Sequence, residues 1–149
     1  NNFLEFRKDI ESNIQRAEEL RLSTRHVIAD LAARYSNVQH ELLKRPIAFL
    51  RHLKGRPKAW FGNNGFRNDL ANDKNPAKHY FAYVYVGFFL PKFIGYILVY
   101  LWEILGLILK LRWASEDVEL GKIGVRHGSE IRRRGLQTIV RNLNEIGGE

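Results

Sequence analysis

The chain has 149 residues, a formal net charge of +8 and no cysteine. Its length allows one modest domain or a few long helices, and the missing cysteines exclude disulfides, iron–sulfur clusters and cysteine-bound zinc. The excess charge is concentrated in residues 44–79, which hold nine Lys or Arg against two Asp. A basic segment beside an apolar run is typical of contact with anionic lipid headgroups, and nucleic acid is the rival explanation.

Residues 1–45 are predicted to form one long amphipathic helix. There is no Gly or Pro between Phe3 and Leu43, and apolar residues recur every three or four positions. At about 60 Å this helix is too long for the chain to bury alone. We therefore expect the helix either to pack its apolar stripe on a partner helix, as in a coiled coil, or to double back in a bundle. The residues expected on the partner-helix face are Phe6, Ile10, Ala17, Leu20, Leu31 and Val38.

Residues 46–79 are predicted to form a basic, aromatic connector at an interface. A short amphipathic helix is expected after Pro46, and it should end at Gly55 and Pro57. The Asn- and Gly-rich stretch that follows is typical of a loop. Its aromatic side chains favour the membrane–water interface, although a protein partner would serve equally well. The residues expected to contact lipid in this connector are Arg51, Lys54, Arg56, Lys58 and Trp60.

Residues 80–112 are predicted to form a membrane segment. The run from Tyr80 to Leu111 carries only three charged side chains and would measure about 48 Å as a helix, against about 30 Å for the hydrocarbon layer. We expect one transmembrane helix over about 88–110, with Pro91 near its start. The residues expected at its lipid interfaces are Lys92, Lys110, Arg112 and Trp113.

Glu103 would lie within the apolar layer of that predicted helix. A carboxylate there costs about 2–3 kcal/mol unless it faces a partner or takes up a proton. We therefore expect Glu103 to contact a partner subunit inside the membrane. Proton or ion handling is the alternative, but no second acid or basic relay residue accompanies Glu103 in the predicted span.

Residues 113–149 are predicted to form a soluble helical tail. Ser115, followed by two acids, is typical of a helix start, and a last helix is expected from Ser129. The basic run at 132–134 indicates either a solvated helix face or contact with lipid phosphate or nucleic acid. The glycines expected to interrupt the tail are Gly121, Gly124 and Gly128.

The expected fold is therefore all-α, with these four segments and no independent globular core. The sequence has no phosphate-binding glycine loop, no GxSxG and no HExxH motif. Its five histidines never fall three or four positions apart, so no local metal pair exists. We expect no enzyme activity, cofactor or metal, although a phospholipid such as cardiolipin could bind. The chain contains no Met and begins at Asn1, which indicates a processed or truncated product.

The segment VYVGFFLPKFIGY resembles the short membrane helix of ATP synthase subunit g, in which glycines follow aromatic residues. The layout of the whole chain resembles the single-span supernumerary subunits of mitochondrial respiratory complexes and ATP synthase. The resemblance implies a non-catalytic accessory subunit, integral to the mitochondrial inner membrane, that stabilises assembly or a dimer contact. Its partners would be other subunits of the complex and anionic lipid.

Two other functions are compatible with the sequence. In the first, the basic and aromatic residues of 44–67 bind an anionic membrane surface while the helix over 3–43 recruits a soluble partner by coiled coil. In the second, the chain is a soluble helical subunit that binds nucleic acid, as many ribosomal proteins do, and the run over 80–111 is its buried core. The length of that apolar run makes nucleic-acid binding the least favoured of the three.

Overall fold

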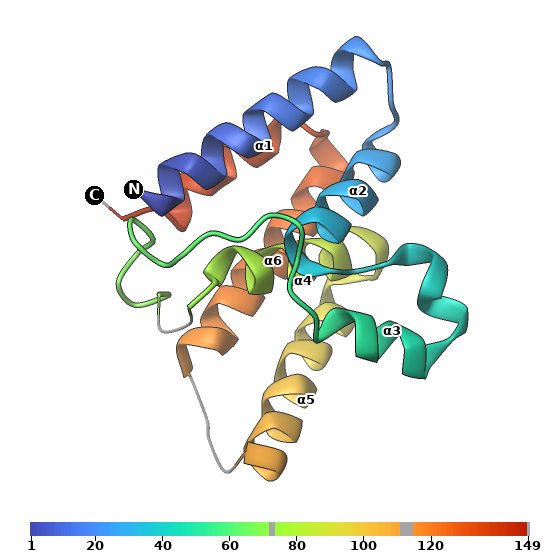
Figure 1. The fold of residues 1–149 in the computed structure, drawn as a ribbon, viewed down its shortest axis with the longest axis vertical. Helices are drawn as coiled ribbons and strands as arrows, with labels where there is room; N and C mark the ends of the chain where they lie inside the picture. Colours follow the sequence, from blue (N-terminus) through green and yellow to red (C-terminus); the bar gives the residue numbers. More distant parts are fainter. Residues whose placement is uncertain (72–73, 111–114, 149) are drawn as a thin grey trace.

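The computed structural model describes residues 1–71, 74–110 and 115–148, and the chain is all-helical over these residues (Figure 1). The one pairing of β type in this part of the chain is an isolated bridge between Phe66 and Gly147. The elements in chain order are α1 (Asn2–Glu19), α2 (Thr24–Ser36), the 3-10 helix η1 (His40–Lys44), α3 (Pro46–Leu53), α4 (Pro76–Phe89), α5 (Lys92–Lys110), α6 (Ser115–Arg134), α7 (Thr138–Asn142) and the 3-10 helix η2 (Leu143–Glu145).

The prediction of one long N-terminal helix is wrong, because the chain turns between α1 and α2. Arg21 adopts a left-handed φ of 54°, and the Ser23 side chain then caps α2 by accepting a hydrogen bond from the His26 amide at 3.2 Å. Asn37, at a φ of 57°, ends α2 in the same left-handed conformation, which Asn tolerates better than most residues. The turn therefore needs neither Gly nor Pro, and their absence from the sequence was misleading.

The chain closes its own hydrophobic core, against the prediction of no independent core. Phe6 lies at the centre, with its ring 5.1 Å from that of Tyr35 and 5.4 Å from that of Phe61. Phe81 packs on Tyr35 at 5.0 Å, so α1, α2, the connector and α4 all meet there. Residues of α6, α7 and η2 complete the same cluster. Because the chain turns between α1 and α2, the apolar residues of both helices lie in the same core. In one straight helix they would extend too far to meet.

The apolar run over 80–111 is divided between the core and the surface. Its first part is α4, which lies between α2 and α6 and buries most of its side chains. Pro91 follows the end of α4, and α5 then begins in a new direction (Figure 1).

None of the helices, as far as the described residues go, combines the length and the apolar character needed to cross a bilayer. The predicted transmembrane helix over about 88–110 is therefore wrong, and so is the prediction of an integral membrane protein, with its location in the mitochondrial inner membrane. The physical reason is that the apolar run is not one helix, because residues 80–89 belong to α4 and are packed in the protein's own core, and Pro91 separates them from α5.

The predicted break of the tail at its glycines is also wrong, since α6 runs through them without interruption. A Cβ on Gly128 would lie 2.1 Å from the Val84 carbonyl oxygen, and one on Gly87 would lie 2.0 Å from that of Val125. Gly124 lies against Tyr80 and Val84 in the same way, so α4 and α6 run in the same direction with their backbones in contact. The glycines are packing residues rather than helix breakers.

Candidate functional site

One face of α5 is apolar and open to solvent. We call Phe93, Ile97, Leu101, Ile104 and Ile108 the α5 stripe. They recur at steps of four, four, three and four, which places them on one side of the helix. The residues at its two ends, Phe93 and Ile108, are each 66 % exposed. Five further large apolar side chains are exposed on the same helix, namely Leu98, Tyr100, Trp102, Leu105 and Leu107.

The opposite face of α5 holds the helix on α6. Val99 is buried together with Val118 and Val125 of α6, and a Cβ on Gly95 would lie 2.6 Å from Val125 Cγ1. Glu103 follows Val99 by one turn and is half-buried, whereas its two sequence neighbours are exposed. Glu103 therefore belongs to the inner side of α5. This placement does not test the predicted contact of Glu103 with a partner subunit.

Basic side chains gather beside the first turn of α5. Lys92 is exposed there, with its Nζ 5.9 Å from the ring centre of Tyr96. Arg132, at the end of α6, donates a hydrogen bond to the Leu90 carbonyl oxygen at 3.4 Å, and Arg133 beside it is exposed. The α5 stripe thus begins next to two cations, Lys92 and Arg132. Lys92 was predicted as a lipid contact, whereas the stripe itself was not recognised.

The predicted lipid contacts of the connector all lie at the surface. Arg56 stacks over the ring of Trp60, with its Cζ 5.2 Å from the ring centre. The α3 helix bears no buried residue and exposes Ile47 by 76 % and Leu50 by 45 %. The exposed residues of the predicted set are Arg51, Lys54, Arg56, Lys58, Trp60 and Lys92. Arg112, Trp113 and the side chain of Lys110 lie outside the described residues.

The predicted partner-helix face lies mostly inside the molecule. Its members on α1 and α2 contribute to the core described above, and only Leu20, in the turn between the two helices, is exposed. The sequence pattern identified core residues here. The buried members are Phe6, Ile10, Ala17, Leu31 and Val38.

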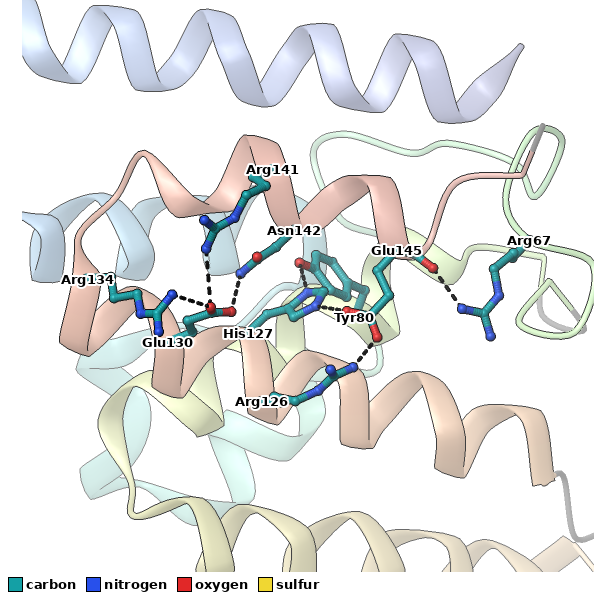
Figure 2. Close-up of polar contacts among 9 residues, drawn as sticks. All are labelled: Arg67, Tyr80, Arg126, His127, Glu130, Arg134, Arg141, Asn142 and Glu145. Carbon is teal, nitrogen blue, oxygen red and sulfur yellow. Dashed lines mark hydrogen bonds and ion pairs between the residues drawn. The ribbon is translucent and has the colours of Figure 1, made fainter.

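A buried hydrogen-bond chain joins α4, α6 and η2 (Figure 2). Tyr80 Oη lies 2.8 Å from Nδ1 of His127, and Nε2 of His127 lies 2.7 Å from a Glu145 carboxylate oxygen. Because a carboxylate only accepts hydrogen bonds, Nε2 carries the proton and Nδ1 accepts from the tyrosine hydroxyl. Arg126 forms an ion pair with the same carboxylate. Arg67 donates to the Glu145 carbonyl oxygen at 2.9 Å.

Burial and hydrogen bonding set the pKa values in this chain. Burial lowers the pKa of His127 below its usual value, and the facing Glu145 offsets this only in part. Partial burial opposes ionisation of Glu145, yet the hydrogen bonds from His127 and Arg126 hold its pKa below the usual value. Burial also raises the pKa of Tyr80. At neutral pH the chain therefore contains a neutral imidazole between a tyrosine hydroxyl and a carboxylate.

Glu130 anchors the last segment of the chain in a similar way (Figure 2). Its carboxylate accepts a hydrogen bond from Asn142 at 3.0 Å and pairs with Arg141 at 3.3 Å and Arg134 at 3.5 Å. A tyrosine–histidine–carboxylate chain has the connectivity of a catalytic relay. Here, however, Tyr80 and His127 are almost fully buried, so a substrate cannot reach them. The two clusters fix α7 and η2 to α6.

The described residues contain no group of three or more His, Asp or Glu side chains placed to hold a metal ion. Comparisons of the chain with protein-family models, with curated proteins and with solved structures gave no match. We therefore infer function from the exposed surfaces, and above all from the α5 stripe.

Proposed function

We propose that this chain is a non-catalytic tether that docks on an anionic membrane surface through the α5 stripe and the cations beside it. In this proposal α5 lies along the headgroup region and does not cross the bilayer. The observation that carries it is the concentration of exposed apolar side chains on one helix. Large exposed apolar patches are rare on monomeric proteins and mark interaction surfaces.

The free energy of transfer favours a lipid surface. Moving a half-exposed Leu or Ile side chain out of water contributes about 1 kcal/mol, and the five members of the α5 stripe face the same way. Tyr100 and Trp102 lie on the same helix and are exposed, and such rings favour the interface between hydrocarbon and water. An amphipathic helix of this kind binds with its apolar face sunk about 5–10 Å into the headgroup boundary.

The charge distribution supports a lipid surface rather than a protein partner in this proposal. Lys92 and Arg132 lie at the start of the α5 stripe, where each could gain about 1 kcal/mol beside anionic headgroups. A helix of a larger assembly could also cover the stripe, which is the accessory-subunit prediction in another form. That partner would need an acidic rim to match the two cations, whereas an anionic bilayer supplies negative charge everywhere.

Co-sedimentation of the full chain with vesicles tests this proposal. We expect strong binding to vesicles of phosphatidylcholine and phosphatidylglycerol in equal amounts, and weak binding to phosphatidylcholine alone. Raising the salt from about 0.1 M to about 1 M shortens the Debye length from about 10 Å to about 3 Å, so binding should weaken toward the level seen with neutral vesicles.

The Leu101→Glu/Ile108→Glu double variant should lose at least about a hundredfold in vesicle affinity, because it removes two apolar contacts and adds two charges that anionic lipid repels. Ser12→Glu/Gln137→Glu is the matched control, since it adds the same charge at exposed polar positions on α1 and before α7. Equal loss in both variants, or equal binding to both kinds of vesicle, would contradict the proposal.

A further inference from the structure

A groove lies between the end of α2, η1 and α3, and its charged lining residues are all basic. It has a volume of about 450 Å³, which is in the range of small-molecule sites. We call it the α3 groove. Its lining residues are Asn37, Leu42, Ala48, Arg51, His52, Gly55 and Arg56.

The cations of the α3 groove are available to a ligand. Over the described residues, Arg51 and Arg56 take part in no ion pair with an acid, and the Arg56 guanidinium rests only on the Trp60 ring. Lys78 donates a hydrogen bond to the Gly55 carbonyl oxygen at 3.1 Å, which brings a further cation to the edge.

The backbone around the groove is fixed. Asn37 is buried and holds a left-handed φ of 57°. A Cβ on Gly55 would lie 3.2 Å from the side-chain nitrogen Nδ2 of Asn37. The end of α3 therefore packs closely on the end of α2. Phe49 and Leu53 of α3 pack on the small cluster that contains Val38. Arg51 is thus carried on an anchored helix and Arg56 on the segment just after it, and both residues are exposed.

We infer that the α3 groove binds a phosphomonoester. Guanidinium groups match phosphate oxygens in both charge and geometry, and two arginines with a histidine suit a group that carries close to two negative charges. A second hollow of about 370 Å³ shares Arg51 and Ala48 with the groove and is also lined by Ile47, which is exposed. A ligand with a phosphomonoester and an adjoining apolar part fits both hollows.

This inference does not depend on the proposed membrane docking, because it concerns another element and a soluble ligand can test it. Titration calorimetry of the full chain with inorganic phosphate and with glycerol 3-phosphate is the first measurement. The second is co-sedimentation with vesicles that contain phosphatidic acid, a phosphomonoester lipid, compared with phosphatidylglycerol vesicles of matched charge.

The Arg51→Gln/Arg56→Gln double variant should bind phosphomonoesters at least about tenfold more weakly than the unchanged chain. Lys8→Gln/Arg16→Gln is the matched control, because it removes the same charge from exposed positions on α1. Both variants change exposed side chains, and circular dichroism checks that each is folded. The α5 variant Leu101→Glu/Ile108→Glu should keep its phosphomonoester binding even where it loses vesicle binding.

The outcomes separate the two sources of the phosphate group. Binding of glycerol 3-phosphate that is lost only in the Arg51→Gln/Arg56→Gln variant supports a site for soluble phosphate compounds. A preference for phosphatidic acid over phosphatidylglycerol, lost in the same variant and without soluble binding, supports a lipid headgroup site. Equal weakening in the control variant, or no binding in either assay, would overturn the inference.

Discussion

His127 makes the stability of the fold depend on pH. It is buried between Tyr80 and Glu145 and is held in its neutral form, since burial lowers its pKa below the usual 6.5. In the unfolded chain the same imidazole takes up a proton as the pH falls through 6.5, while in the folded protein it does not until the pH is lower. The free energy of unfolding should therefore decrease as the pH falls below about 6.5.

Glu145 extends this pH dependence to lower values. Its pKa in the folded protein lies below the usual 4.5, so the unfolded state is again protonated first and stability is lost further below pH 4.5. Urea unfolding at pH 7.5, 6 and 5 measures the contribution of His127, and a further measurement at about pH 4 measures that of Glu145. His127→Gln should be less stable at pH 7.5 and show a flatter profile between pH 7.5 and 5, whereas the exposed His26→Gln should follow the unchanged chain. An identical slope in His127→Gln would contradict this account.

The sequence could not have revealed the buried chain of Tyr80, His127 and Glu145. These residues are separated by 47 and 18 positions, so no helical spacing connects them. The predicted lipid contacts of the connector were easier to place at the surface, because Lys and Arg beside Gly and Pro are rarely buried. Which surface they contact remains a prediction, since side-chain exposure alone names no partner.

Glycines determine how closely α4 and α6 pack. Gly128→Ala should destabilise the protein by about 2–3 kcal/mol, because the added methyl group would meet the Val84 carbonyl oxygen of the neighbouring backbone, which cannot move aside cheaply. Helix propensity alone predicts the opposite sign, a gain of about 1 kcal/mol. Thermal unfolding followed by circular dichroism distinguishes the two.

A second glycine on the same helix provides a graded control. At Gly121 the added methyl would meet only side chains, those of Val99 and Tyr83, at 3.0 and 3.1 Å. These can shift by a few tenths of an ångström, so Gly121→Ala should cost less than about 1 kcal/mol. If both alanine variants were as stable as the unchanged chain, the close contact of α4 and α6 would be incorrect.

Element boundaries were predictable where the chain contains strong local signals. Pro46 begins a helix as expected, and Pro91 divides the apolar run. The turn at Arg21 was missed, because a non-glycine residue with positive φ leaves little trace in the sequence. Gly121 and its neighbours were misread, because a glycine inside a helix weakens it in isolation but permits close packing when another backbone approaches.

At the scale of the whole molecule, the apolar run serves two purposes. Its first part lies in α4, in the core between α2 and α6, and its second, longer part is α5, which projects from the body of the molecule (Figure 1). The mean hydropathy of the run does not distinguish its buried part from its exposed part, since composition does not show which other elements a segment packs against. The number of apolar residues led to a predicted transmembrane helix, whereas their arrangement leaves one exposed stripe.

Quenching of Trp102 by brominated lipid tests the docking of α5 most directly. A Trp60→Phe/Trp113→Phe variant leaves Trp102, which is exposed on α5, as the single tryptophan. On vesicles of phosphatidylglycerol and brominated phosphatidylcholine we expect its emission to shift to the blue and to be quenched, most strongly by bromines near the headgroup boundary. Adding Leu101→Glu and Ile108→Glu should abolish both effects. Unchanged emission with bound vesicles would show that α5 faces away from the lipid and contradict the proposed function.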